Sequence, residues 1–260
     1  MATFLFDKII FGPVKSRRLG ISLGINLLPS ANKVCNFNCI YCECGWTYNI
    51  KNFERLLPSR NDVRNALEKK LAEMKEHNRA PDVITFAGNG EPTLHPAFPG
   101  IIDDSIELRN KYFPETKIAV LSNSTTITFP LIKEALLKVD MNILKLDSGF
   151  DLTVRIHNQP RVNVKVKELI ENLKKFNGQL IIQTLFVRGS YHGKAIDNTI
   201  PGELDEWLKA IKLIKPSEVM IYTISRETPS GGQLHKVPLK ELNKIAAMVR
   251  KLGIETRVSG

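Results

Sequence analysis

The amino-acid sequence predicts an α/β fold built around a parallel sheet, because short apolar runs alternate with helical patterns along its 260 residues. The runs are apolar throughout and several are rich in β-branched or aromatic residues, as strands are when helices cover both faces of a parallel sheet. They span residues 21–28, 83–87, 118–121, 143–146, 180–186 and 219–224. Six β-then-α units imply right-handed crossovers, and ligands gather at the carboxyl ends of such strands.

Four segments between or after the strands have the apolar spacing of amphipathic helices. Ser59 and Asp62 are typical of a capped helix start. The apolar faces are Val63, Leu67, Leu71 and Met74; Val166, Leu169, Ile170 and Leu173; Leu204, Trp207, Leu208, Ile211 and Ile214; and Leu242, Ile245, Ala246, Val249 and Leu252. No repeat or linker interrupts this pattern, so we expect a single domain over residues 1–260.

The composition is typical of a globular protein, with 43% hydrophobic and 25% charged residues. The sequence contains no apolar run of membrane-spanning length and no signal-peptide pattern at its start, so we expect a cytoplasmic protein without a membrane partner. The net charge of +10 favours a polyanion such as RNA as a partner, although solvated helix faces explain many of the cations. Residues 15–18 and 155–167 contain the basic clusters of interest.

Four cysteines lie within residues 35–44, which favours metal binding over disulfide pairing. The spacing of Cys35, Cys39 and Cys42 suits one loop wrapping an iron–sulfur cluster, and three ligands to four irons leave one iron open for a chelating substrate. Two alternatives stand beside this interpretation. Cys44 completes the ligand set of a structural zinc ion in one of them, and of an electron-carrying cluster in the other. We expect Cys44 to bind neither.

The cysteine spacing, with Tyr41 just before the third cysteine, resembles the signature of the radical S-adenosylmethionine (SAM) superfamily. The resemblance implies a partial (β/α)6 barrel with parallel strands inside and helices outside. It also implies one [4Fe–4S] cluster on Cys35, Cys39 and Cys42, SAM bound at the open iron, and Tyr41 against the adenine. A one-electron donor such as flavodoxin or ferredoxin is the implied partner of this oxidoreductase chemistry.

Polar segments follow the second and third predicted strands. Gly88-Asn89-Gly90-Glu91 is a glycine-rich turn that lets a ligand approach the backbone. It resembles the superfamily element that holds the amino group of SAM, with Asn89 in place of a glycine. After the third strand, Ser122 and Asn123 offer a hydroxyl and an amide. In the superfamily such residues bind the ribose or the carboxylate of SAM.

The last three strands contain polar residues that need partners or a polar cavity. Strand alternation places Lys145 and Asp147 on one face, which we expect to be the barrel interior. We take Lys145, Asp147 and Arg226 as candidate catalytic residues, and Gln183 and Thr184 as further cofactor contacts. A structural ion pair or a buried polar network is an equally good interpretation of these residues.

The wider pattern of residues 11–20, 183–189 and 221–226 resembles a subgroup related to wyosine (tRNA base) synthases. The resemblance implies that the protein cleaves SAM reductively to a 5′-deoxyadenosyl radical, which abstracts hydrogen from a substrate such as a tRNA base. Archaeal synthases of that type use a second cluster, and Cys44 alone cannot hold one. A peptide, a protein or a small metabolite is the alternative substrate, and a non-catalytic Fe–S or zinc protein is the third hypothesis.

Overall fold

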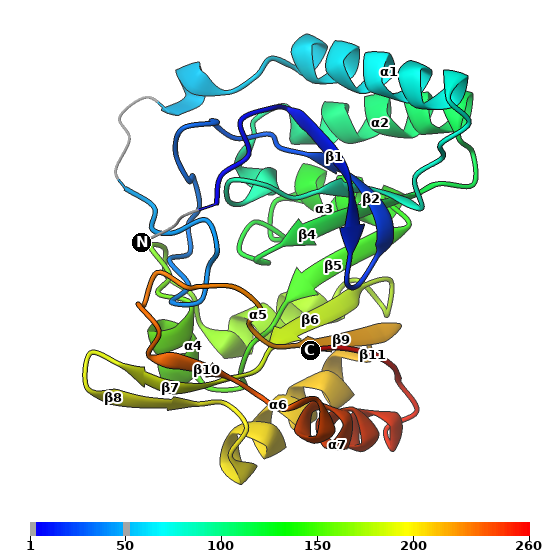
Figure 1. The fold of residues 1–260 in the computed structure, drawn as a ribbon. Helices are drawn as coiled ribbons and strands as arrows, with labels where there is room; N and C mark the ends of the chain where they lie inside the picture. Colours follow the sequence, from blue (N-terminus) through cyan, green and yellow to red (C-terminus); the bar gives the residue numbers. More distant parts are fainter. Residues whose placement is uncertain (1–3, 49–52) are drawn as a thin grey trace.

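The structure, a computed structural model, describes residues 4–48 and 53–260. In this part of the chain an eight-stranded sheet has the order β1-β2-β3-β4-β5-β6-β9-β11. Its strands are β1 (Ile10–Ser16), β2 (Gly20–Ile25), β3 (Val83–Phe86), β4 (Lys117–Ser122), β5 (Met141–Lys145), β6 (Ile181–Leu185), β9 (Glu218–Tyr222) and β11 (Glu255–Ser259). All pairs are parallel except β1 with β2. The six predicted strands are β2 to β6 and β9, and the sheet curls into the predicted partial barrel with helices outside (Figure 1).

Helices connect the parallel strands and cover the outer face of the sheet (Figure 1). They are α1 (Arg60–Glu76), α2 (Phe98–Tyr112), α3 (Pro130–Lys138), α4 (Asp151–His157), α5 (Val166–Lys174), α6 (Pro201–Ile214) and α7 (Leu239–Arg250), with short 3-10 turns η1 (Phe53–Leu56) and η2 (Pro92–Leu94). The four predicted helices are α1, α5, α6 and α7, and Ser59 and Asp62 form the predicted capping box. Leu252 is wrong as a helix residue, because α7 ends at Arg250 and Leu252 is exposed.

Strand alternation divides the side chains of the sheet between two environments. Outward residues such as Ile84 and Phe86 pack with the helices in the main core. Inward residues form a separate apolar floor of Val83, Ala119, Met141, Ile143, Ile181 and Met220. Two residues further along β3, β5, β6 and β9, the inward positions are polar: Thr85, Lys145, Gln183 and Tyr222 line a cavity. The barrel interior is therefore a closed apolar floor below a polar cavity at the carboxyl ends of the strands.

The two ends of the curled sheet meet at the tip of the β1–β2 hairpin. The guanidinium of Arg17 donates a hydrogen bond to the carbonyl of Gly260 at 2.7 Å. Arg257, in β11, donates to the carbonyl of Arg18 at 2.7 Å. Since β2 and β11 lie at opposite sides of the sheet, these two contacts bridge the seam of the partial barrel.

The sequence patterns did not predict a second sheet, which has the antiparallel order β10-β7-β8. Its strands are β7 (Val187–Tyr191), β8 (Lys194–Asp197) and β10 (Leu234–Lys236). Val187, Ile196 and Leu234 from this sheet pack in one apolar cluster with Ile40 and Tyr41 of the cysteine loop. The second sheet thus supports the loop on which the candidate site is built. Within the described residues, no helix is both long and apolar enough to cross a membrane.

Candidate active site

The cysteine-containing loop leaves the end of β2 and is fixed by backbone hydrogen bonds on two sides. On one side Val34 donates to the carbonyl of Asn89 at 2.9 Å and accepts from the amide of Glu91 at 3.0 Å. On the other side the amide of Ile40 donates to the carbonyl of His157 at 2.9 Å, at the end of α4. The loop is therefore anchored to the turn after β3 and to the helix after β5.

Cys35, Cys39 and Cys42 line a single cavity of about 510 Å³ at the carboxyl ends of the strands. Cys39 is buried and the other two are partly buried. Side-chain amides reach two of the sulfurs. Asn123 donates to Sγ of Cys35 at 3.5 Å, and Asn158 donates to Sγ of Cys39 at 3.4 Å. Hydrogen bonds of this kind to thiolate sulfur are one of the means by which proteins tune iron–sulfur clusters.

Cys44 has a different position from the other three cysteines. It does not line the cavity, and its Sγ donates to the carbonyl of Gly88 at 3.3 Å. Across residues 4–48 and 53–260, no three His, Cys, Asp or Glu side chains lie close enough together to hold a single metal ion. A four-iron cube binds each thiolate through a different iron, so it needs thiols spread around a space instead of converging on a point. Cys35, Cys39 and Cys42 all line one cavity, as three ligands of one such cluster would.

Lys33 is a buried cation beside the cysteines, and its Nζ donates to the carbonyl of Gly45 at 2.9 Å. Burial opposes its charge, but the thiols of Cys42 and Cys35 outweigh burial and raise the pKa of Lys33. Burial raises the pKa of the Cys35 thiol to about 12, whereas a hydrogen bond from Cys44 lowers the pKa of Cys42 to about 5. Metals bind the thiolate form, and Lys33 supplies positive charge that favours it.

The turn after β3 contains a glycine that no other residue can replace without strain. Gly90 has φ +140°, and a Cβ there would lie 1.8 Å from the carbonyl oxygen of Val34. The turn then presents Glu91, whose buried carboxylate accepts from the hydroxyl of Thr93 at 2.6 Å and from the backbone N–H of Asn123 at 2.6 Å. Burial raises the pKa of Glu91 despite these hydrogen bonds. Glu91 lines the cavity, which gives it a fixed position for binding a cation.

Asn89 differs from its neighbours in the turn. Gly88 and Gly90 line the cavity, but the side chain of Asn89 does not. Its amide exchanges two hydrogen bonds of 2.8 Å with the backbone of Phe6 and donates to the carbonyl of Pro29 at 2.9 Å. The fully buried side chain thus ties the segment before β1 to the start of the cysteine loop, facing away from the cavity.

Ser122 and Asn123, at the end of β4, both line the cavity. The amide of Asn123 donates to Oδ1 of Asn36 at 2.5 Å, and its oxygen accepts from the amide of Thr125 at 3.0 Å. The hydroxyl of Ser122 accepts from the amide of Ser124 at 3.1 Å. These two residues stand next to Glu91, so the ends of β3 and β4 form one polar wall.

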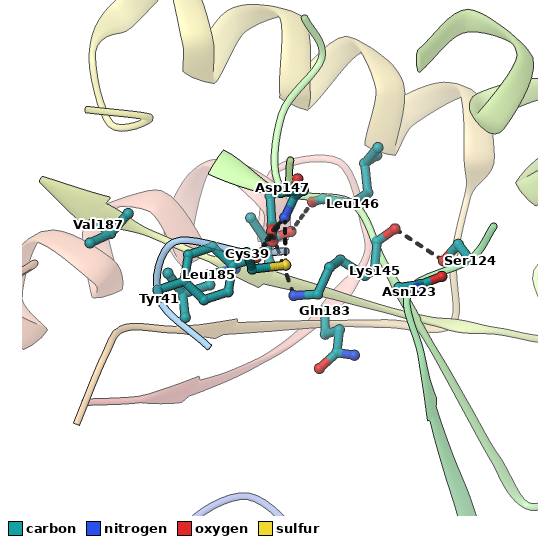
Figure 2. Close-up of polar contacts among 12 residues, drawn as sticks. Cys39, Tyr41, Asn123, Ser124, Lys145, Leu146, Asp147, Gln183, Leu185 and Val187 are labelled. Atoms are coloured by element: carbon teal, nitrogen blue, oxygen red, sulfur yellow. Dashed lines mark hydrogen bonds and ion pairs between the residues drawn. The ribbon is translucent and has the colours of Figure 1, made fainter. Parts of the chain in front are cut away.

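Lys145 and Asp147 meet in a buried network that Figure 2 shows. Nζ of Lys145 lies 3.5 Å from Oδ2 of Asp147 and donates to the hydroxyl of Tyr222 at 3.2 Å. The hydroxyl of Tyr41 donates to the same Oδ2, and the amide of Asn158 donates to it at 2.7 Å. Lys145 lines the cavity, whereas Asp147 lies behind it. The two side chains meet, as strand alternation predicts. Lys145 faces the cavity, and both residues also belong to a buried polar network, which is the alternative that the sequence offered.

Gln183 and Thr184 lie on opposite faces of β6 because side chains alternate along a strand. Gln183 lines the cavity and accepts from Nη1 of Arg18 at 3.2 Å. The hydroxyl of Thr184 donates to the carbonyl of Leu146 at 2.7 Å and accepts from Nε1 of Trp207 at 3.0 Å. Thr184 therefore faces α6, and the structure does not bring its side chain to the cavity.

Arg226 follows β9 at the rim of the cavity. It pairs with Glu43 of the cysteine loop at 2.8 Å, and its side chain is 62% exposed. Its guanidinium also lies 5.4 Å from the ring centroid of Phe4. Arg226 therefore lies at the surface, at the edge of the cavity.

The sequence patterns did not assign four residues to the site: Arg18, Lys33, Asn158 and Tyr222. Lys33 stands two residues before Cys35, where a loop lysine is ordinarily solvated. Asn158 follows α4, and no spacing connects it to Cys39. The sequence could have identified Tyr222, because this residue ends β9 on the inward face in the same way that Lys145 ends β5.

Comparisons with known proteins agree with this geometry. Residues 31–213 match the family model described as Radical SAM superfamily. A protein named GTPase Obg from Brachyspira hyodysenteriae is 31% identical over 228 residues, which are 86% of this chain and 31% of that protein. A UPF0026 protein from Helicobacter pylori (strain ATCC 700392 / 26695) is 32% identical over 243 residues, which are 91% of this chain and 72% of that protein. The chain thus spans about a third of the first relative and most of the second.

Solved structures show the same fold at low sequence identity. A radical SAM methyltransferase from Sphaerobacter thermophilus has a TM-score of 0.66 at 13% identity, covering 92% of this chain and 65% of that one. A structure of TYW1 with a lysine-pyruvate adduct has a TM-score of 0.59 at 14% identity, covering 88% of this chain and 73% of that one. The family model, which spans most of the chain, and the three thiols facing one cavity place this protein in the radical SAM superfamily.

Proposed function

We propose that Cys35, Cys39 and Cys42 hold one [4Fe–4S] cluster and that the adjoining cavity binds SAM and a substrate. The observation that supports this proposal is that three thiols line the cavity, whereas Cys44 does not line it and bonds to the carbonyl of Gly88. When bound, the cluster and SAM supply reductive cleavage of the sulfonium to methionine and a 5′-deoxyadenosyl radical, which takes a hydrogen atom from the substrate.

The protein's own groups bind and orient the cofactor. The carboxylate of Glu91 is fixed by Thr93 and Asn123 and is suited to accept hydrogen bonds from the ammonium of SAM. Gly88 and Gly90 line the cavity, and we assign their backbone groups to contact with the cofactor. Ser122 and Asn123 supply polar groups for the ribose or the carboxylate. Tyr41 lines the cavity beside Cys42, and we assign its ring to packing against the adenine.

Lys145 and Asp147 have different tasks in this proposal. Asp147 is buried behind the cavity and accepts hydrogen bonds from Tyr41, Asn158 and the amide of Leu185. It therefore holds the cysteine loop against β5 and β6. Lys145 presents its ammonium to the cavity, close to the rings of Tyr41 and Tyr222. We assign it to orienting an acceptor group of the cofactor or the substrate.

An external donor must supply one electron for each cleavage. We propose a small acidic carrier such as flavodoxin or ferredoxin, since the net charge of +10 attracts an anionic protein.

An RNA base is a second candidate for the substrate. The net charge of +10 favours it, as does the likeness of the fold to TYW1, although that likeness concerns the fold alone. RNA binding through phosphates weakens steeply with added salt. Copurified RNA that dissociates with salt would favour this candidate, and a nucleic-acid-free preparation with full SAM cleavage would count against it.

The test of the proposed function is anaerobic reconstitution with iron and sulfide, followed by reduction in the presence of SAM. We expect about four iron and four sulfide per chain, together with 5′-deoxyadenosine detected by mass spectrometry. Cys39→Ala should lose both the cluster and the product. Cys44→Ala is the matched control, and it should keep both. A variant Cys39→Ala that still cleaves SAM, or a Cys44→Ala protein without a cluster, would overturn the ligand assignment.

A further inference from the structure

The side chain of Arg18 enters the cavity from the tip of the β1–β2 hairpin, at the seam of the partial barrel. Arg257 fixes the backbone there by donating to the carbonyl of Arg18 at 2.7 Å. Nη1 of Arg18 donates to Oε1 of Gln183 at 3.2 Å. Its Cζ lies 4.4 Å from the ring centroid of Tyr222. A contact from β11 to the backbone of Arg18, and contacts from β6 and β9 to its guanidinium, therefore hold this side chain in one place in the cavity.

Arg18 lacks an acidic partner in residues 4–48 and 53–260, unlike two other cations that line the cavity. Lys145 pairs with Asp147 at 3.5 Å, and Arg226 pairs with Glu43 at 2.8 Å. A guanidinium has five N–H donors in a planar fork. The side-chain amide of Gln183 accepts from one nitrogen and the ring of Tyr222 contacts the guanidinium, so other N–H donors keep no acceptor among these contacts. The cavity therefore contains a fixed cation that still needs an anion.

The buried carboxylate that lines the cavity, that of Glu91, already accepts hydrogen bonds from other residues. Glu91 lies at the end of β3, where Thr93 and Asn123 hold it. The groups proposed to bind SAM thus come from β3 and β4, whereas Arg18 rests on Gln183 of β6 and Tyr222 of β9. This separation places the unmatched cation on the side of the cavity that the cofactor contacts leave free.

We propose that Arg18, with Gln183, binds a carboxylate of the substrate, so that the substrate is a small molecule or a side chain bearing a carboxylate group. This inference rests on the proposed function, because it assumes that SAM occupies the β3–β4 side. A planar carboxylate matches the guanidinium fork in a bidentate pair. Nζ of Lys145, which is paired with Asp147, also lies 5.8 Å from the ring centroid of Tyr222.

Size also favours a small carboxylate over a nucleic acid. The cavity of about 510 Å³ must take SAM together with the reacting end of the substrate. A phosphate of an RNA backbone would meet exposed cations at the surface before it reached a side chain held inside the barrel. RNA is therefore an outcome for the test to detect, and the structure favours a carboxylate.

The experiment measures binding to the cluster-loaded, oxidised protein by ligand-observed NMR, with matched probes. Succinate and glutarate are compared with their uncharged diamides, with inorganic phosphate, and with a short single-stranded RNA. We expect at least one dicarboxylate to bind about tenfold or more tightly than its diamide. Tighter binding of RNA or phosphate than of both dicarboxylates, or equal binding of acid and amide, would overturn the proposal.

Variants distinguish a specific carboxylate site at Arg18 from a general effect of positive charge on dicarboxylate binding. Arg18→Gln should weaken dicarboxylate binding about tenfold, and Arg18→Lys should weaken it less while keeping the charge and the fold. Arg79→Gln removes the same charge at an exposed position that does not line the cavity, and it should leave the affinity within about twofold. If Arg79→Gln weakens binding as much as Arg18→Gln, the effect is general charge and the proposal fails.

The last measurement repeats the dicarboxylate binding experiment in the presence of saturating SAM. Dicarboxylate binding should persist in its presence if the two ligands occupy different sides of the cavity. If SAM abolishes it, Arg18 binds the carboxylate of SAM itself and the proposal is wrong. Production of 5′-deoxyadenosine by the same preparation tests the proposed function separately, so the two can fail independently.

Discussion

The amide of Asn158 donates a hydrogen bond of 3.4 Å to the sulfur of Cys39, which lies 119 residues earlier in the chain. The same amide reaches the hydroxyl of Tyr41 and Oδ2 of Asp147, both at 2.7 Å. One side chain thus connects a proposed cluster ligand to the polar network behind the cavity. Removing it would leave buried acceptors without a donor, which destabilises the site.

We expect Asn158→Ala to assemble the cluster but to release iron faster than the natural protein. The reason is that Asn158 orients Cys39 and holds Tyr41 and Asp147 together. The measurement is the rate of anaerobic iron transfer to a chelator, followed by absorbance. Asn61→Ala, at an exposed position in α1, is the control and should match the natural protein. Equal rates for Asn158→Ala and the control would show that the amide plays no part in retaining the cluster.

Lys33 should shift the reduction potential of the bound cluster. Its ammonium is buried beside Cys35 and Cys42, and a positive charge in such a setting stabilises the more negative, reduced cluster. We expect Lys33→Met, which keeps most of the volume, to move the potential to a more negative value. Redox titration followed by electron paramagnetic resonance measures it.

Lys33→Arg keeps the charge and serves as the matched variant, with a potential close to that of the natural protein. An unchanged potential in Lys33→Met would mean that Lys33 acts only through its hydrogen bond to the carbonyl of Gly45.

The sequence predicted the parts of the site that depend on local order along the chain. The apolar runs gave the strands, and polar residues just after them, such as Glu91 and Asn123, reached the cavity because parallel strands end at one edge. The side chain of Thr184 does not reach the cavity, for a reason visible in the sequence. It adjoins Gln183 on one strand, so only one of the two faces inward.

Other features depend on contacts between distant segments, which no local pattern encodes. The cavity contact of Arg18 requires the sheet to curl until the β1–β2 hairpin meets β11. The second sheet joins β7 to a β10 of only three residues. The side chain of Asn89 turned away from the cavity because the backbone of Phe6 and Pro29 satisfies it.

Acid should destabilise the fold partly through His157, whose backbone carbonyl anchors the cysteine loop at Ile40. Burial lowers the pKa of His157 from 6.5, and within the described residues its Nδ1 has no hydrogen-bond partner. The unfolded chain takes up a proton near its ordinary pKa, whereas the folded protein resists it. Stability is therefore complete above the unfolded pKa and is lost as the pH falls toward the lowered folded value.

We expect His157→Gln to lose less stability than the natural apoprotein between about pH 7.5 and about pH 5.5. The difference is about 1.4 kcal/mol for each unit by which the pKa is lowered. Burial also lowers the pKa of His95, so part of the acid sensitivity should persist in the variant.

Chemical denaturation at several pH values measures the effect. His235→Gln, at an exposed position in β10, is the control. A pH profile of His157→Gln that superimposes on that of His235→Gln would contradict the prediction.

Gly90 should be the least replaceable glycine of the candidate site, and Gly202 provides its matched control. A Cβ at Gly90 would lie 1.8 Å from the carbonyl oxygen of Val34, at φ +140°, where side chains are rarely tolerated. The backbone would have to shift and would break the bridge between Val34 and Gly90. We expect Gly90→Ala to cost about 2 kcal/mol or more in the free energy of unfolding and to reduce SAM affinity, because Glu91 follows directly.

Gly202 lies in α6, and a Cβ there would have nothing within 4 Å, so Gly202→Ala should be neutral or stabilising by up to about 1 kcal/mol. Denaturant unfolding of the apoproteins and equilibrium binding of SAM to the cluster-loaded proteins give the two quantities. If Gly90→Ala unfolds like Gly202→Ala and binds SAM normally, the turn does not need glycine to position Glu91.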